Sequence, residues 1–165
     1  MNDAPRFPPN KAVGFLLAQV GGYAARRFAE RLVPLSLTPS DVGILRLLAD
    51  SAGISQQELA SRLGIHASRL VALVDDLESR GLVRRQEKPE DRRSYALHLT
   101  DKGRSALMQA GQIGREHNDA LCAGLSREER ETLASLLVRV ADHAGLKPGI
   151  HPGYQRLGRS SKTTV

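Results

Sequence analysis

The chain has 165 residues, 41% hydrophobic and 25% charged, the proportions of a globular domain that can bury a core without disulfides or metal. A single cysteine excludes an internal disulfide and fits a reducing cytoplasm, and no run of residues predicts a membrane span or a secretory signal. The formal net charge of +6 is typical of a nucleic-acid partner, but four of the basic residues follow Ala144, where no acid occurs. The function must therefore be inferred from local clusters of charge and not from the net charge.

Residues 1–9 contain three prolines and little apolar content, which predicts a flexible N-terminal arm. From about residue 10, apolar side chains follow helical spacing, and Pro34 ends this first helix. Each of its three glycines weakens the helix by roughly 1 kcal/mol relative to alanine. We therefore expect it to pack against partners on more than one side.

Two capping patterns then predict the starts of a second and a third helix. Thr38 is placed as the N-cap of the second helix, Pro39 at its first position and Asp41 near its positive end. Ser55 and Glu58 have the spacing of a capping box for the third helix.

A tight turn at Gly64 leads to a fourth helix, predicted from His66 or Ala67 to about Arg80, and Gly81 ends it at the C′ position. Its apolar residues recur at i, i+3, i+4 and i+7, so they face the core: Leu70, Leu73, Val74 and Leu77.

Residues 82–86 and 94–99 predict two strands of a hairpin, with a charged tip at residues 88–91. Two short helices joined by a tight turn and followed by a hairpin form a winged helix-turn-helix. The predicted fold class is therefore mainly α with a small β-hairpin wing.

Two further helices complete the predicted domain. A Thr-Asp pair at residues 100–101 caps a long helix that we expect to run past Leu121, and Ser126 opens the last helix, which Gly145 ends. Residues 145–165 are rich in Gly, Pro, Ser and basic residues. They predict either a flexible basic tail or an arm that contacts DNA or a partner subunit.

Only in the major groove does each base pair present a distinct pattern, and that groove admits one α-helix. The second helix of the motif must therefore expose its N-terminal residues to base edges. Arg69 can donate two bonds to guanine, Ser68 can bond a base or a phosphate, and Val71 can meet a thymine methyl. His66 is predicted as an N-terminal cap or a phosphate contact.

The hairpin concentrates positive charge. Because Arg84 and Arg85 are neighbours on one strand, they face opposite ways, and at most one of them faces DNA. At the tip, Arg92 and Arg93 can approach a narrow A·T-rich minor groove, where the potential is most negative. Asp91 can hold Arg93 in one rotamer and so reduce the entropy lost on binding.

Residues 91–93 (DRR), with residues 97–103 (LHLTDKG), resemble the wing signature of the MarR family of transcriptional regulators. Residues 77–85 (LESRGLVRR) and residues 37–39 (LTP) are also similar to that family, and the resemblance spans roughly residues 10–144.

The resemblance implies a homodimer in which helices at about residues 10–33 and 104–144 form a dimerisation lobe. Residues 38–103 would then form a DNA-binding lobe, and two such lobes would reach adjacent major grooves. It also implies that Arg93 is the minor-groove arginine and Asp91 its orienting partner.

The recognition helix departs from the family's pattern. Val71 and Ala72 stand where many members have Thr or Ser and then Arg, and Asp76 stands where a second Arg is common. This places more weight on Ser68, Arg69 and the wing. It also favours an alternative, a winged-helix protein-interaction module that does not bind DNA specifically.

In the family, a pocket between the two lobes often binds small aromatic acids, and here Tyr23 and Arg26 are the candidate ligand residues. Arg26 would pair with the carboxylate, the alternative being surface charge or dimer contacts. Cys122 is more typical of a small packing residue than of an oxidation sensor, because sensing relatives usually carry the cysteine in the first helix.

The five histidines form no metal-binding motif, and no nucleophile–base pair or phosphate loop predicts an enzyme, so we expect no cofactor. The sequence predicts a cytoplasmic, ligand-responsive repressor that binds a pseudopalindrome in double-stranded DNA as a homodimer. Its half-sites should lie roughly 10 base pairs apart.

Overall fold

The computed structural model describes residues 11–88 and 91–151, and the side chains of residues 88–94 lie outside this description. The predicted N-terminal arm, the part of the tail after residue 151 and the side chains of the wing-tip residues 91–93 are therefore not described. The elements are α1 (Val13–Leu32), η2 (Val33–Leu35), α2 (Pro39–Asp50), β1 (Ile54–Ser55), α3 (Gln56–Leu63), α4 (Ala67–Ser79), β2 (Val83–Lys88), β3 (Asp91–Leu99), α5 (Asp101–Leu121) and α6 (Arg127–His143).

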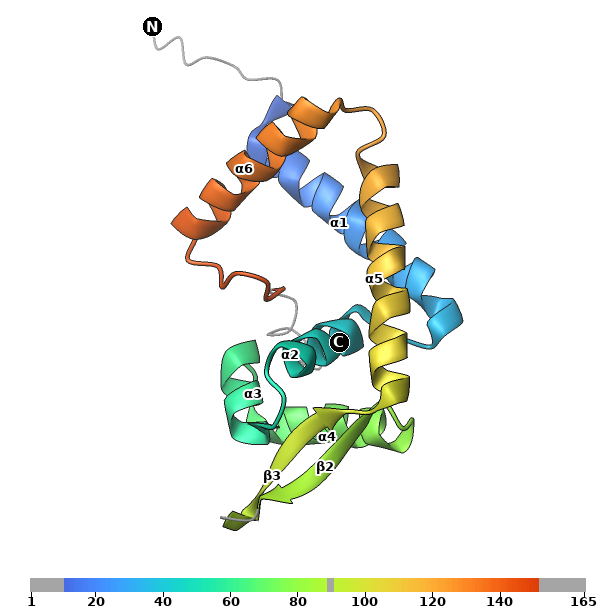
Figure 1. Cartoon of the computed structure of the whole chain (residues 1–165). Helices are drawn as coiled ribbons and strands as arrows, with labels where there is room; N and C mark the ends of the chain where they lie inside the picture. Colours follow the sequence, from blue (N-terminus) through green and yellow to red (C-terminus); the bar gives the residue numbers. More distant parts are fainter. Residues whose placement is uncertain (1–10, 89–90, 152–165) are drawn as a thin grey trace, which may run out of the picture.

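These elements occupy two ends of the molecule, joined by α5 (Figure 1). Helices α2, α3 and α4 and the three strands lie at one end, and α1 and α6 lie toward the other. With six α-helices and one small antiparallel sheet among the described residues, the predicted mainly α fold with a hairpin wing is confirmed.

Local capping fixes where the helices of the first end begin. Thr38 Oγ1 accepts from the Asp41 amide at 3.2 Å, and Asp41 Oδ2 accepts from the Thr38 amide at 2.9 Å, a complete capping box. In α3, Ser55 Oγ accepts from the Glu58 amide at 3.2 Å, but the Glu58 carboxylate lies 2.6 Å from Arg62. The capping box predicted there is therefore only half formed, because Arg62 one turn later competes for the carboxylate.

Glycines end α3 and α4 where expected. Gly64 has φ +67° and Gly81 has φ +70°, a left-handed conformation that side chains with a Cβ rarely adopt. The prediction that the long helix continues past Leu121 was wrong. That helix, α5, ends at Leu121 because the chain turns at Cys122, whose carbonyl accepts from the Leu125 amide at 3.0 Å.

The sheet is antiparallel, with the strand order β1-β3-β2. Both hairpin strands are longer than predicted, and in their register Val83 lies opposite Leu99 and Arg85 opposite Leu97. The sequence did not predict β1, which pairs Ile54 with Leu97 on the other edge of β3. The base of the wing is thus fixed on both sides.

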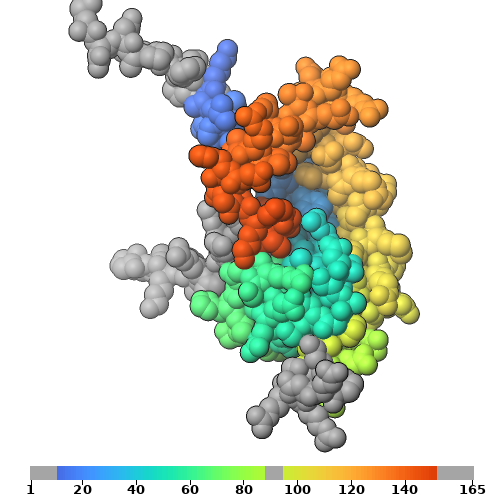
Figure 2. Space-filling model, turned by 60° about the vertical axis from the view of Figure 1, so that its left-hand side comes forward, coloured from blue at the N-terminus to red at the C-terminus, as the bar shows by residue number. Residues whose placement is uncertain are grey.

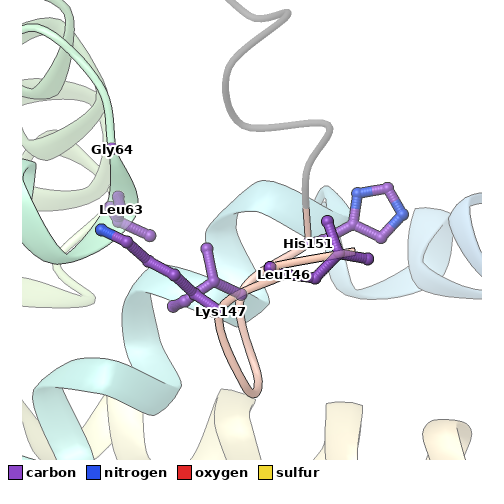
Figure 3. A pocket seen from close by; sticks show the side chains of 7 residues that line it. Leu63, Gly64, Leu146, Lys147 and His151 are labelled. Carbon is purple, nitrogen blue, oxygen red and sulfur yellow. The ribbon is translucent and has the colours of Figure 1, made fainter. Parts of the chain in front are cut away.

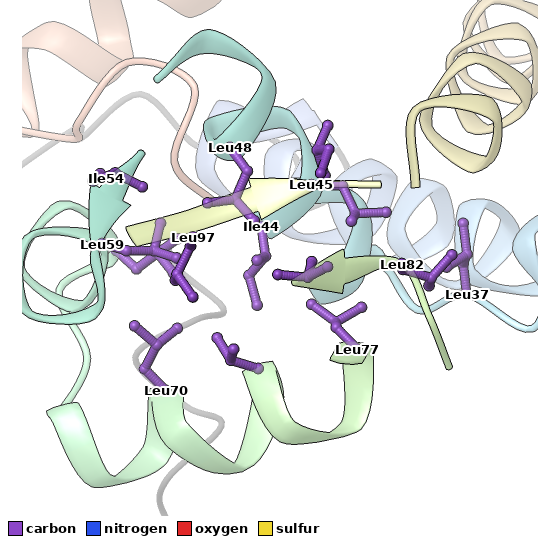
Figure 4. Close-up of a cluster of buried hydrophobic side chains, with 14 of the residues drawn as sticks. Leu37, Ile44, Leu45, Leu48, Ile54, Leu59, Leu70, Leu77, Leu82 and Leu97 are labelled. Atoms are coloured by element: carbon purple, nitrogen blue, oxygen red, sulfur yellow. The ribbon is translucent and has the colours of Figure 1, made fainter. Parts of the chain in front are cut away.

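A cluster of buried aliphatic side chains joins the sheet to α2, α3 and α4 (Figure 4). On α4, Leu70, Val74 and Leu77 are fully buried, as the periodicity predicted, whereas Leu73 is only half-buried. Each such buried side chain stabilises the fold by about 1.5–3 kcal/mol. Helix α4 therefore rests on a rigid platform that decides which of its residues face outward.

The other end of the molecule leaves apolar side chains uncovered. No residue of α6 is buried, and the large exposed apolar residues of α1 and α6 are Val13, Phe15, Leu16, Leu17, Val20, Tyr23, Leu133, Leu136, Leu137, Val138 and Val140. We call these residues the apolar surface of α1 and α6. So many exposed apolar side chains on two helices at one end of the molecule mark an interaction site rather than ordinary scattered exposure.

Taken one at a time, none of the described helices is long and apolar enough to cross a membrane. Among these residues, Val13–Leu35 and α2 together have the length and apolar composition of a membrane span, but the chain bends by 76° between them.

Candidate nucleic-acid interface

The first turns of α4 point away from the core. His66, Ser68 and Arg69 are exposed, and Val71 is 41% exposed. His66 occupies the N-cap position, but its side chain makes no capping hydrogen bond, so the first amides of α4 lack a side-chain cap. Free amides at a helix N-terminus favour an anion such as phosphate.

Ser68 and Arg69 share the outward face of α4. Neither side chain forms a hydrogen bond or an ion pair with any other residue that the structure describes. Both are therefore free to bond a partner, while Leu70 beside them is fully buried and holds the helix in place. The arrangement brings together the residues that the sequence predicted for reading bases.

Arg85 does not belong to this free surface. Its guanidinium lies 2.5 Å from Asp75 Oδ1, pairs closely with Glu78, and donates from Nε to Gln56 Oε1 at 2.9 Å. Burial by itself lowers the pKa of Arg85, but the two carboxylates together raise it above its usual range. Arg85 thus joins β2 to α3 and α4, and Arg84, which is exposed, faces the other side of the sheet.

Arg80 makes a second internal network at the C-terminal end of α4. It donates to the Ser36 carbonyl at 2.6 Å and lies 3.1 Å from Asp41 and 2.8 Å from Asp76. The carbonyl of Arg80 accepts from Lys102 Nζ at 2.8 Å. Arg80 therefore joins α4 to the start of α2, to the turn before α2 and to the start of α5.

Sequence reasoning missed these two roles. The i, i+4 spacing of Asp76 and Arg80 was a visible signal, whereas the pairing of Arg85 with Asp75 depends on the way β2 packs on α4. Asp76, which departs from the family's pattern, is offset by Arg80 within the fold. Its charge therefore weighs less against DNA binding than the sequence implied.

The wing tip carries the remaining predicted contacts. Asp91, Arg92 and Arg93 begin β3, and their side chains lie outside the described residues. Their roles toward DNA stay predictions.

The predicted ligand residues Tyr23 and Arg26 both lie on α1, but only Tyr23 faces α5. Tyr23 lines a cavity of about 130 Å³ with Arg27, Arg31 and His117. Arg26 does not line it: its guanidinium lies 5.9 Å from the Tyr23 ring centre and 4.0 Å from Glu30.

Electrostatics make this cavity suitable for an anion. Desolvation by burial lowers the pKa of His117, and the charges of Arg31 and Arg27 lower it further. Arg27 is paired with Glu30 at 2.6 Å, whereas no ion pair engages Arg31 within the described chain. Arg31 is therefore the available cation of the cavity.

Cys122 is half-buried in the turn after α5. Over the described ranges, no three His, Cys, Asp or Glu side chains gather in a way that would hold a metal ion.

Comparison with known proteins agrees with this architecture. The family model described as "MarR family" matches residues 35–94, which run from η2 through α4 into the wing. A relative from Thauera aromatica, described as a candidate transcriptional regulatory protein for the hcr operon, is 36% identical over 129 residues, 78% of each chain.

Solved structures are similar over most of their length. The transcriptional repressor CouR bound to a 23-mer DNA duplex has a TM-score of 0.71 and 38% identity, and the match covers 80% of this chain and 94% of that one. CouR bound to p-coumaroyl-CoA has a TM-score of 0.67 and 34% identity, covering 80% and 93%. The protein described here belongs to the MarR family of transcriptional regulators.

Proposed function

We propose that the protein is a repressor that binds a pseudopalindromic operator in double-stranded DNA as a homodimer and leaves it when a small aromatic anion binds. One observation carries the proposal: the N-terminal half of α4 exposes Ser68 and Arg69, which pair with none of the described residues, on a helix whose other face buries Leu70, Val74 and Leu77. The similarity to CouR, a repressor whose complex with a DNA duplex is known, supports it.

In this proposal Arg69 donates to a guanine edge, Ser68 bonds a base or phosphate, and Val71 contacts a thymine methyl. The uncapped amides after His66 face a phosphate. Arg84 lies on the exposed side of the hairpin and is proposed as a phosphate contact.

The wing completes the interface. We place Arg93 in the minor groove, with Asp91 orienting it and Arg92 beside it at the backbone.

The second copy of the chain covers the apolar surface of α1 and α6. Phe15 is 52% exposed and Leu136 50% exposed, and burying such side chains drives association. Helices at about 10–33 and 104–144 would then form the dimerisation lobe, with residues 38–103 as the DNA-binding lobe. The two recognition helices would face successive turns of the major groove.

The effector site is proposed at the cavity of Tyr23 and Arg31. Arg31 would pair with a carboxylate or phosphate and Tyr23 would contact an aromatic ring, while the neighbouring Arg26 supports the Tyr23 ring from outside. CouR bound to p-coumaroyl-CoA, an aromatic acyl group on an anionic carrier, supports this class of ligand. Acting on DNA, the protein is proposed to work in the cytoplasm without catalytic activity of its own.

A gel-shift titration with the DNA upstream of the protein's own gene tests the proposal. In the homodimer Arg69→Ala removes a contact from each half-site, so it should weaken the discrete complex at least about thirtyfold, because each bidentate contact to guanine contributes about 1–3 kcal/mol. Arg127→Ala at the start of α6 is the charge-matched control: it removes a 91% exposed arginine outside the apolar surface of α1 and α6, at the end of the molecule away from α4, and should bind like the wild type.

The alternative, a winged-helix module that binds protein, makes the opposite prediction for salt. Phosphate contacts release counterions, so the affinity of a DNA-binding regulator falls steeply with salt concentration. A logarithmic salt slope near zero, with Arg69→Ala and Arg93→Ala both neutral, would favour the interaction module and reject the proposal.

A further inference from the structure

The segment after α6 crosses back to the other end of the same chain. Residues 145–151, here called the strap, leave α6 at Gly145, where φ is +67°, and the Leu146 amide donates to the Ala141 carbonyl at 3.0 Å. Figure 1 shows this segment descending from α6 toward α2 and α3, and in Figure 2 it lies against their surface.

Lys147 attaches the strap to the first helix of the helix-turn-helix. Its Nζ donates to the Ser61 carbonyl at 3.3 Å. Ser61 lies in the last turn of α3, where its carbonyl also accepts from the Gly64 amide at 3.2 Å and where a cation is favourable. The contact thus lies directly before the turn at Gly64 that leads into the recognition helix. Figure 3 shows the Lys147 side chain extending toward Leu63 and Gly64.

Two further contacts hold the strap against the DNA-binding end. Ile150 packs, partly buried, on the same aliphatic core as α2, α3 and α4. Gly149 has φ +71°, and a Cβ at this position would lie 2.6 Å from Nη2 of Arg46 on α2. The strap therefore follows a path that only glycine adopts without strain, in direct contact with α2.

Helix α6 makes few other contacts with residues that the structure describes. None of its residues is buried, and at its start Arg130 lies 3.3 Å from Asp119 of α5. The two ends of the molecule are joined by the continuous helix α5 and by the connection from α1 through η2 to α2, and the strap adds a link from α6. Each further link between two bodies restricts hinging between them.

We infer that the strap fixes the recognition helix relative to the dimerisation helix α6 of the same chain, and so sets the half-site spacing that the dimer accepts. This inference rests on the proposed function, binding of a dimer to two half-sites. Lys147, Gly149 and Ile150 are in this sense positioning residues: they act through α3 and α4 without needing to touch a base.

The test uses Gly149→Ala, which strains the strap, and Lys147→Met, which keeps the aliphatic stem but removes the bond to Ser61. Gly124→Ala is the matched control, because Gly124 has open space around it and no positive φ. Affinity is measured for full-chain protein on duplexes whose half-sites are separated by one or two base pairs more or fewer than in the operator.

The wild type should prefer one spacing. Both strap variants should lose about fivefold or more of that preference, the lower end of the usual range for coupling between sites. Gly124→Ala should keep the preference. An unchanged preference in both strap variants would overturn the inference.

A measurement without DNA separates this inference from the proposed function. Spin labels at Ala72→Cys, in a Cys122→Ser background, report the distance between the two recognition helices of the dimer. A broader distance distribution in Gly149→Ala and Lys147→Met supports the strap's role, whether or not the protein binds an operator. Failure to bind any operator would reject the proposed function alone. A distribution identical to that of Gly124→Ala would overturn the strap's role.

Discussion

Replacing Arg80 with methionine tests the network that fixes the C-terminal end of the recognition helix. Arg80 forms an ion pair with Asp41. The Asp41 side chain is 7% exposed and that of Arg80 27% exposed, so the pair is intermediate between a buried and a surface ion pair. Breaking a buried pair costs about 3–5 kcal/mol, and an exposed pair contributes about 0–1 kcal/mol.

Two details of the structure narrow the expected cost of Arg80→Met. Asp41 keeps its bond from the Thr38 amide, which lowers the cost, whereas the Ser36 carbonyl loses its bond from Arg80, worth about 1 kcal/mol. Methionine preserves the packing of the aliphatic stem. The free energy of unfolding should therefore fall by about 2–3 kcal/mol.

Urea unfolding at one fixed protomer concentration measures this loss, because the stability of a dimer depends on concentration. Asp76→Asn is the control: the Asp76 side chain is 61% exposed, and its loss should cost less than about 1 kcal/mol. A double-mutant cycle with Asp41→Asn, which retains a capping side chain, isolates the pair. If Arg80→Met unfolds at the wild-type urea concentration, or if Asp76→Asn costs as much, the reasoning about burial is refuted.

Three further predictions concern other parts of the molecule. Gly103→Ala would place a Cβ 2.0 Å from the Leu82 carbonyl oxygen, so thermal unfolding should show a loss of about 3 kcal/mol or more, whereas Gly114→Ala, with nothing within 4 Å, should not destabilise. Leu137→Asp on the apolar surface of α1 and α6 should give a monomer in sedimentation; a variant that still sediments as a dimer would contradict the assigned interface. Because folding lowers the pKa of His117, the unfolded chain gains the proton first as pH falls below about 6.5; wild-type stability should decline there, and His117→Gln should flatten that slope in pH-dependent unfolding.

Features decided by neighbouring residues were predictable from the sequence. The cap at Thr38 and the helix ends at Gly64 and Gly81 depend on a few backbone bonds within one turn. Strand β1 was not predictable, since Ile54 and Ser55 become a strand only by pairing with β3, more than forty residues later. Tertiary pairing, not local preference, makes that element.

In the candidate sites too, the orientation of a residue was predictable where one helix decides it and not where a second helix does. Helical periodicity was enough to place Arg69 outward, because the buried stripe of α4 leaves only one face exposed. Periodicity within α1 alone does not decide which of its arginines faces the cavity. That depends on where α5 lies, and its position turns Arg27 and Arg31, rather than Arg26, toward His117.

Charge on the recognition helix shows how folding prepares a surface for DNA. In sequence, the C-terminal half of α4 is acidic and argues against a polyanionic partner. In the fold, Arg85 from β2 pairs with Asp75 and Glu78, and Arg80 pairs with Asp76. Arg69, one helical turn or more away, has no ion pair with any residue that the structure describes. The acids thus anchor the wing and the end of the helix, and Arg69 stays available at the end of the helix that we propose enters the groove.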